Sequence, residues 1–146
     1  HGATIAAIPD ATPLEPQGPR IPSGTYTVTL DADGARSTRT LVVREDPRVA
    51  VTTAQLAAQF ALARAIEADA DATFAASHAV AQRDATLARD LARANGGFIQ
   101  LFMAVESADA APTATQRVLF ATQHAAAAPL LARARGVAPG AGRNGL

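Results

Sequence analysis

The chain has 146 residues, of which 49% are hydrophobic and only 4% aromatic, and its 13 basic residues balance 13 acidic ones. A net charge of zero excludes the basic surface that nucleic-acid binding requires, and the lack of Cys excludes disulfides and thiolate chemistry. No apolar run approaches the ~20 residues that cross a bilayer, so we expect no membrane span.

Residues 1–24 are predicted to be a Pro-rich lead-in with one short strand. Pro recurs from Pro9 to Pro22, which excludes a helix and confines the strand to the apolar piece between Ile5 and Ile8. The start at His1, without the basic and apolar regions of a signal peptide, suggests a processed or truncated chain.

Residues 25–48 are predicted to form a β-hairpin, because polar and apolar residues alternate strictly in this segment. Residues 31–34 supply the turn, since Gly34 tolerates a positive φ. The alternation places on one face Tyr26, Val28, Leu30, Leu41 and Val43. An isolated hairpin is only marginally stable in water, so we expect this one to be completed by other polypeptide.

Residues 53–135 are predicted to form a helical domain. Thr52 or Thr53 offers an N-cap hydroxyl, and neither Pro nor Gly follows until Gly96. Apolar residues recur at spacings of three and four, among them Leu56, Phe60 and Phe74. The first helix would hold roughly 40 residues if it were continuous, and the weakening of the stripe favours a break near residues 77–84.

The triplet at residues 95–97, Asn-Gly-Gly, is typical of a helix C-cap followed by a turn. A short amphipathic helix with Phe98 and Phe102 is expected next, and then a loop at residues 108–112.

A last helix is predicted to begin at Thr113, which forms a capping-box pattern with Gln116, and to end at about Arg135. Pro129 is expected to kink this helix. Residues 136–146, which start with a capping Gly, are predicted to be a disordered tail.

Several short pieces occur in an order that points to one protein family: GTYTVTL at 24–30, DG at 33–34, LVV at 41–43 and DPRV at 46–49. This order resembles the C-terminal region of secreted bacterial β-propeller proteins of the BNR-repeat, sortilin-like kind, often labelled glycosyl hydrolases. The likeness covers roughly residues 4–135. It includes the Pro-rich stretch 12–19, the Leu-x-x-Gln-Phe element at 56–60 and the ADAAPT sequence at 108–113.

The resemblance implies an Ig-like or fibronectin-like β unit with a helical appendage, exported by a bacterium to the periplasm or the medium and fused behind β-propellers. This chain departs from the family pattern, since it contains neither a propeller nor the upstream strands that would complete a sandwich. The family's enzymatic label would belong to the propeller, so the resemblance implies no catalytic residue here.

Few residues are candidates for chemistry. His1 is a weak metal candidate, because its amino group and ring could hold copper with a second His, but His78 and His124 each stand alone in Ala-rich helices. The acidic cluster at 67–71 and the pair Asp31 and Asp33 fall short of the about six oxygens of a Ca²⁺ site. A solvated helix face and an ordinary turn are the favoured interpretations.

Other apparent motifs are interpreted structurally. Ser77 and His78 resemble two members of a catalytic triad, but adjacent helical residues point about 100° apart. Paired carboxylates for glycoside hydrolysis lack an aromatic platform that would hold a sugar. The acidic and basic residues from 83 to 93 are expected to form exposed intrahelical pairs, and the Phe residues to fill the core.

We therefore expect an α+β protein: a short antiparallel β unit, part of an Ig-like or fibronectin-like sandwich, followed by an Ala-rich antiparallel helical hairpin or three-helix bundle. Because Ala buries little apolar area, we expect neighbouring polypeptide to complete the core. The predicted function is a non-catalytic structural or protein-interaction module without cofactors. It would be either the C-terminal part of an exported β-propeller protein, bound to upstream domains of its parent, or an accessory subunit bound to other subunits of a larger periplasm-facing assembly. A propeller-type hydrolase fragment and a ligand- or metal-binding periplasmic protein remain alternatives. The residues expected to contact a partner are Ile5, Ile8, Tyr26, Val28, Leu30, Leu56, Phe60, Phe74, Phe98 and Phe102.

Overall fold

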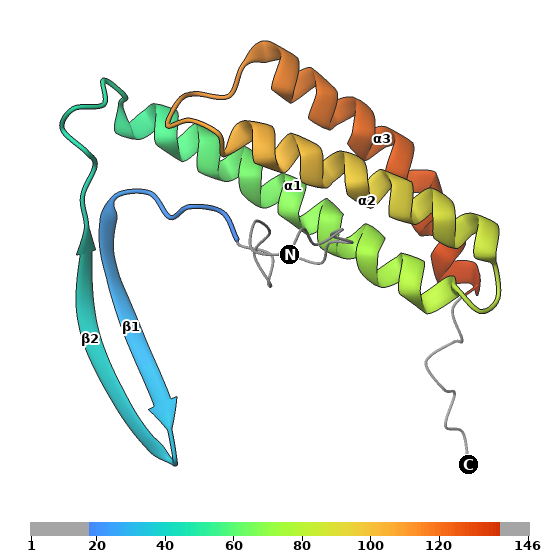
Figure 1. Ribbon diagram of the computed structural model, residues 1–146, viewed down its shortest axis with the longest axis horizontal. Coiled ribbons are helices and arrows are strands. Elements are labelled where there is room, and N and C mark those ends of the chain that lie inside the picture. Colours follow the sequence, from blue (N-terminus) through green and yellow to red (C-terminus); the bar gives the residue numbers. More distant parts are fainter. Residues whose placement is uncertain (1–17, 138–146) are drawn as a thin grey trace, which may run out of the picture.

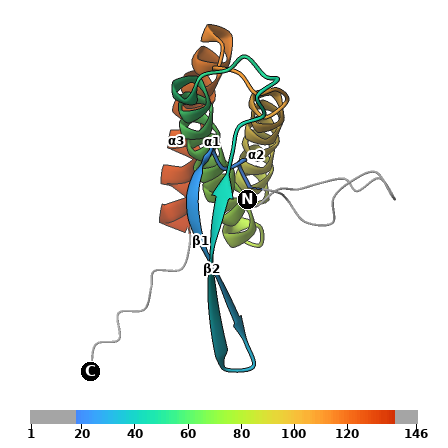
Figure 2. The same ribbon diagram turned by 90° about the vertical axis from the view of Figure 1, so that its left-hand side faces the viewer.

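The computed structural model describes residues 18–137, and the fold over this range is α+β, as expected. A two-stranded antiparallel hairpin precedes three helices in the described range (Figure 1). The elements are β1 (Gly24–Ala32), β2 (Ala35–Val43), α1 (Thr53–Val80), α2 (Ala85–Val105) and α3 (Ala114–Val137). The helices lie side by side as a bundle, while the hairpin extends away from them (Figures 1 and 2).

The hairpin has the register that the alternation of its residues predicts. Tyr26 pairs with Leu41, and Val28 pairs with Arg39. The turn is only Asp33-Gly34, with φ of 51° and 78°, because both strands extend further than expected. Two consecutive positive φ values are those of a type I′ turn, whose twist matches that of the strands, and Asp-Gly is among its favoured sequences.

The long helical segment is broken where the apolar stripe weakens. Thr52 caps α1 in a capping box with Gln55, and the helix ends at Val80. The side chain of Asp84 then accepts a hydrogen bond of 2.9 Å from the backbone N–H of Leu87 and so caps α2. The predicted break between residues 77 and 84 is therefore confirmed.

The prediction of a helix end at residues 95–97 is wrong, because α2 continues through this segment. Asn95 is buried, and its Nδ2 donates a hydrogen bond of 2.8 Å to the carbonyl oxygen of Ala70 in α1. A Cβ on Gly97 would lie 3.2 Å from Nε2 of Gln123 in α3. These small and polar residues let α2 approach its neighbours closely.

The start of α3 is confirmed and its end is corrected. The N–H of Gln116 donates to the hydroxyl of Thr113 at 3.1 Å, and the N–H of Thr113 donates to Oε1 of Gln116 at 2.8 Å. The helix accommodates Pro129 and runs to Val137, so Gly136 lies inside it and not beyond its end. The rest of the predicted tail lies outside the described residues.

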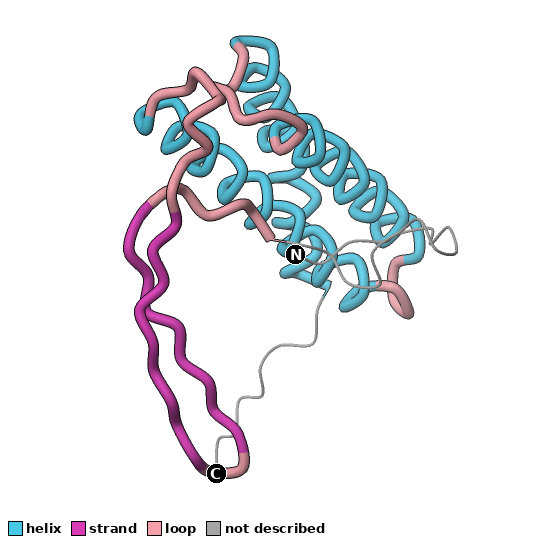
Figure 3. The backbone as a smooth tube through the Cα atoms, turned by 60° about the vertical axis from the view of Figure 1, so that its left-hand side comes forward, coloured by secondary structure: helices cyan, strands magenta, loops and turns pink. Residues whose placement is uncertain are grey.

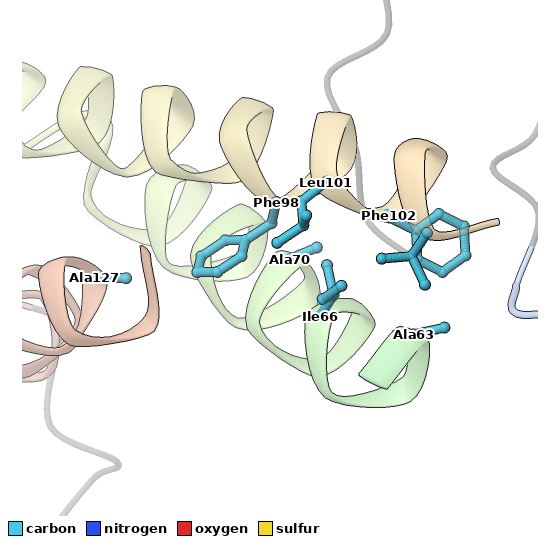
Figure 4. Packing of buried hydrophobic residues seen from close by; sticks show 8 residues of the cluster. Ala63, Ile66, Ala70, Phe98, Leu101, Phe102 and Ala127 are labelled. Carbon is cyan, nitrogen blue, oxygen red and sulfur yellow. The ribbon is translucent and has the colours of Figure 1, made fainter. Parts of the chain in front are cut away.

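The bundle encloses a hydrophobic core of its own. Figure 4 shows Phe98, Leu101 and Phe102 of α2 directed onto α1. The principal cluster consists of Ala63, Ile66, Ala70, Phe98, Leu101, Phe102, Val105 and Ala127. A second cluster, near the α1–α2 turn, consists of Val80, Leu87, Leu91 and Ala134. The expectation that neighbouring polypeptide must complete the core is therefore wrong for the helices, because Ala-lined contacts let a few large side chains fill the space between them.

Candidate interaction surface

The hairpin carries a largely apolar face that no described helix covers along most of its length. We call the side of the hairpin that bears Tyr26, Val28, Leu30, Leu41 and Val43 the hairpin face, because cross-strand partners share one side of a sheet. Val28 is 49% exposed, Leu30 64% and Leu41 46%. Both strands run clear of the helices along most of their length (Figure 3). The hairpin face is therefore open.

The opposite side of the hairpin is polar except for Val42, which pairs with Thr25. Thr27 pairs with Thr40, and Thr29 pairs with Thr38. At its tip Arg36 donates to both carboxylate oxygens of Asp31, at 2.8 Å and 3.0 Å. This hydrogen-bonded guanidinium holds the pKa of Asp31 below its ordinary value of 3.8. The hairpin thus has the amphipathic pattern of a strand pair that packs on one side only.

Tyr26 is anchored at the base of the hairpin. Its hydroxyl donates a hydrogen bond of 2.6 Å to the carbonyl oxygen of Pro22, four residues upstream. The ring lies over Gly24, where an added Cβ would be 3.4 Å from Cε2 of Tyr26. The aromatic ring is half-buried in this position and orients the start of β1.

A polar junction joins the hairpin to the bundle. Ser23 donates a hydrogen bond of 2.7 Å to Oε1 of Glu45, and Thr53, the first residue of α1, donates to the same oxygen at 3.3 Å. The backbone N–H of Arg20 donates to Glu106 at 3.1 Å, at the C-terminal end of α2. These contacts attach the base of the hairpin to one end of the bundle.

A cavity of about 160 Å³ lies at this junction and contains two of the predicted contact residues. Leu56 and Phe60 of α1, both half-buried, line it together with Val43 at the end of β2. Glu45 and Glu106 add carboxylates to its wall.

The remaining predicted contact residues lie elsewhere. Phe98 and Phe102 are buried in the core, as the core interpretation predicts, so they present no surface to a partner in this conformation. Phe74 is half-buried, and its ring lies 4.4 Å from that of His78. Ile5 and Ile8 lie outside the described residues, and so does His1.

The interpretation of the acidic cluster of α1 as a solvated helix face holds for Asp71, which is exposed, but is wrong for Glu67 and Asp69. Glu67 is buried and pairs with Arg64. Oδ2 of Asp69 lies 2.6 Å from Nδ1 of His124 in α3, so His124 has a partner on another helix. Asp69 therefore faces α3, whereas Glu67 lies near Gly18, where an added Cβ would be 3.5 Å from Oε1 of Glu67, and Asp71 is exposed.

No group of three or more His, Cys, Asp or Glu side chains able to hold a metal ion occurs within residues 18–137.

The other apparent motifs have structural contacts. The hydroxyl of Ser77 donates to the carbonyl oxygen of Phe74 at 2.7 Å, which agrees with a structural role. Arg93 pairs with Asp90 at 3.3 Å within α2, as expected. Asp84 instead caps α2, and its Oδ2 lies 3.5 Å from a guanidinium nitrogen of Arg133 in α3.

Sequence reasoning missed Gln59 and Asn95, two buried amides that hold backbone groups of other elements. Gln59 Nε2 donates to the carbonyl oxygens of Val105 and Ala108, both at 2.6 Å, and so satisfies the end of α2 and the following loop. The available signal was a polar residue at a helical position otherwise occupied by apolar ones.

None of the described helices combines the length and apolar character that crossing a bilayer requires. No family model, curated protein or solved structure matches the chain.

Proposed function

We propose that the chain is a non-catalytic interaction module whose hairpin packs against upstream polypeptide of the same parent protein. The observation that carries this proposal is the uncovered hairpin face. Most of its apolar side chains lie in register on one side of the hairpin, and most of its polar side chains lie on the other. Exposed apolar surface arranged in this way marks an interaction site.

Two free edges support the same conclusion. β1 pairs only with β2 among the described strands, so each strand has one edge without a backbone partner. Exposed strand edges are templates for pairing with further strands. A hairpin with nine residues in each strand offers a long template.

Tyr26 favours an Ig-like or fibronectin-like sandwich as the completed β unit. In such sandwiches a Tyr near the start of a strand often bonds through its hydroxyl to backbone a few residues upstream, in what is called a tyrosine corner. The hydrogen bond from Tyr26 to Pro22 has this form. Together with the resemblance to BNR-repeat, sortilin-like proteins, it supports the C-terminal part of an exported bacterial β-propeller protein as the parent.

The alternative roles in ligand binding or hydrolysis receive less support. Two hollows on the bundle, of about 340 Å³ each, are shallow, whereas small-molecule sites bury most of the ligand surface. The junction cavity of about 160 Å³ is smaller than the about 300–1,000 Å³ of typical small-molecule sites. Its Glu45 carboxylate already accepts hydrogen bonds from Ser23 and Thr53.

The proposal is tested by placing a charge on either side of the hairpin in the whole gene product. We expect Val28→Asp to destabilise the completed β unit by about 3 kcal/mol, because a carboxylate would be buried without a partner. Thr27→Asp is the matched control, since Thr27 faces the polar side. Protease susceptibility of the hairpin in increasing urea, followed by mass spectrometry, measures the difference.

In the isolated chain both substitutions should be tolerated equally, because neither side of the hairpin is covered there. Equal tolerance of the two substitutions in the whole gene product would overturn the proposal.

A further inference from the structure

We propose that the hairpin face is covered by a second β-sheet that brings a carboxylate to Arg39, so that Arg39 selects the sheet that can dock. This inference rests on the proposed function and deepens it by specifying the chemistry of the partner surface.

Arg39 lies within the apolar side of the hairpin. It is the direct cross-strand partner of Val28, and Leu41 and Ser37 are its neighbours on the same side of β2. Its guanidinium donates to the carbonyl oxygen of Thr38 at 3.0 Å, and no carboxylate within the described range reaches it. By contrast Arg36 and Arg48 are paired with Asp31 and Asp46.

A sheet that covers Val28 and Leu41 would also cover Arg39. Stacked sheets lie about 10 Å apart, so little water remains between their inner faces. Arg keeps its charge at any ordinary pH and offers only donors. A buried guanidinium is therefore tolerated only with a charged, hydrogen-bonded partner. A carboxylate is the group that best matches its planar fork of donors.

A second copy of this chain cannot supply that carboxylate by stacking face to face. The ten positions on this side of the hairpin contain no acidic residue, since Asp31 pairs across to Arg36 on the polar side. Such a dimer would bring two Arg39 side chains together without a counter-charge. The geometry therefore points to a different sheet, one with a carboxylate among apolar residues, and the proposed function places that sheet in the upstream part of the parent protein.

The first experiment locates the covering surface in the whole gene product. A photo-reactive p-benzoylphenylalanine in place of Val28 should cross-link to a β-segment upstream of this chain. The same residue in place of Thr29, on the polar side, should not.

The second experiment tests the charge. We expect Arg39→Glu to speed hydrogen exchange of the hairpin amides in the whole gene product roughly 30-fold or more, because two carboxylates would then meet. Thr38→Glu adds the same charge to the polar side and should have little effect. Replacing the Asp or Glu nearest the cross-link by Lys should restore slow exchange in the Arg39→Glu variant.

The outcomes separate the two proposals. One outcome is a cross-link to an upstream sheet together with hydrogen exchange that is no faster in Arg39→Glu than in Thr38→Glu. This outcome would overturn the role of Arg39 but not the proposed interaction module. A Val28 cross-link to a second copy, to the helices of the chain itself or to nothing would overturn both.

Discussion

Single buried amides fix how the helices of this protein meet. Asn95 is 1% exposed and donates to the Ala70 carbonyl oxygen, so it joins α2 to α1 at the middle of the bundle. Gln59 plays the equivalent part where α2 ends. Polar groups buried in this way are costly when they lose their partners, so they specify one packing arrangement.

Asn95→Ala should lower the free energy of unfolding by about 2 kcal/mol, because it removes a buried hydrogen bond and leaves a small cavity. Gln100→Ala on the exposed side of α2 is the control and should change it by less than about 0.5 kcal/mol. Urea unfolding followed by circular dichroism measures both. Equal effects of the two substitutions would show that Asn95 does not hold the helices together.

At the tip of the hairpin, the pairing of Asp31 with Arg36 is expected to depend on pH. Because the folded hairpin lowers the pKa of Asp31, its stabilisation is present above the ordinary pKa of 3.8 and is lost as the pH falls through the lowered pKa. Arg36→Gln should raise the pKa of Asp31 towards its ordinary value, as measured by NMR titration of the carboxyl carbon. Arg39→Gln, on the other side of the hairpin, should leave it unchanged; an equal shift in both variants would contradict the assigned pair.

Helix α2 contains two adjacent glycines that differ in their surroundings. A Cβ on Gly96 would meet nothing within 4 Å, whereas a Cβ on Gly97 would lie 3.2 Å from Gln123. Gly96→Ala should therefore stabilise the protein by roughly 0.5–1 kcal/mol through helix propensity. Gly97→Ala should stabilise the protein by less, because the Gln123 amide must move to make room for the new Cβ. Thermal unfolding measures both; a loss of stability in Gly96→Ala is the result expected of a left-handed cap and would contradict a continuous helix.

The elements show which parts of the fold local sequence can predict. Strand alternation, the Asp33-Gly34 turn and the caps at Thr52 and Thr113 depend on neighbours in the chain, and all are present. The course of α2 through residues 95–97 depends on contacts with α1 and α3 that lie far away in sequence. Tertiary packing there overrides the turn preference of Asn-Gly-Gly.

The candidate surface was predictable because it depends, like the turn and the caps, on neighbouring residues in the chain. Alternation alone placed Tyr26, Val28 and Leu30 on one side of a strand, and the open hairpin face contains all three. The pairing of Asp69 with His124 was not predictable, because it joins residues of α1 and α3 that are distant in the chain. The same holds for the burial of Glu67.

The whole molecule consists of two parts that differ in how well they are covered. The bundle buries Phe98, Ile66 and Leu91 completely, whereas the hairpin leaves its apolar side open. A hairpin without a further layer is marginally stable, so the two parts should open with very different free energies. The proposed docking role of the hairpin rests on this contrast between a bundle with its own buried core and a hairpin without one.

Hydrogen exchange measured by NMR on the 146-residue chain tests this contrast most directly. We expect the amides of β1 and β2 to exchange rapidly, while those around Ile66 in α1 and Phe98 in α2 exchange only when the bundle unfolds. The hairpin amides should become slow in the whole gene product. Hairpin amides as slow as those of the helices in the isolated chain would contradict the account, because the hairpin would then need no partner.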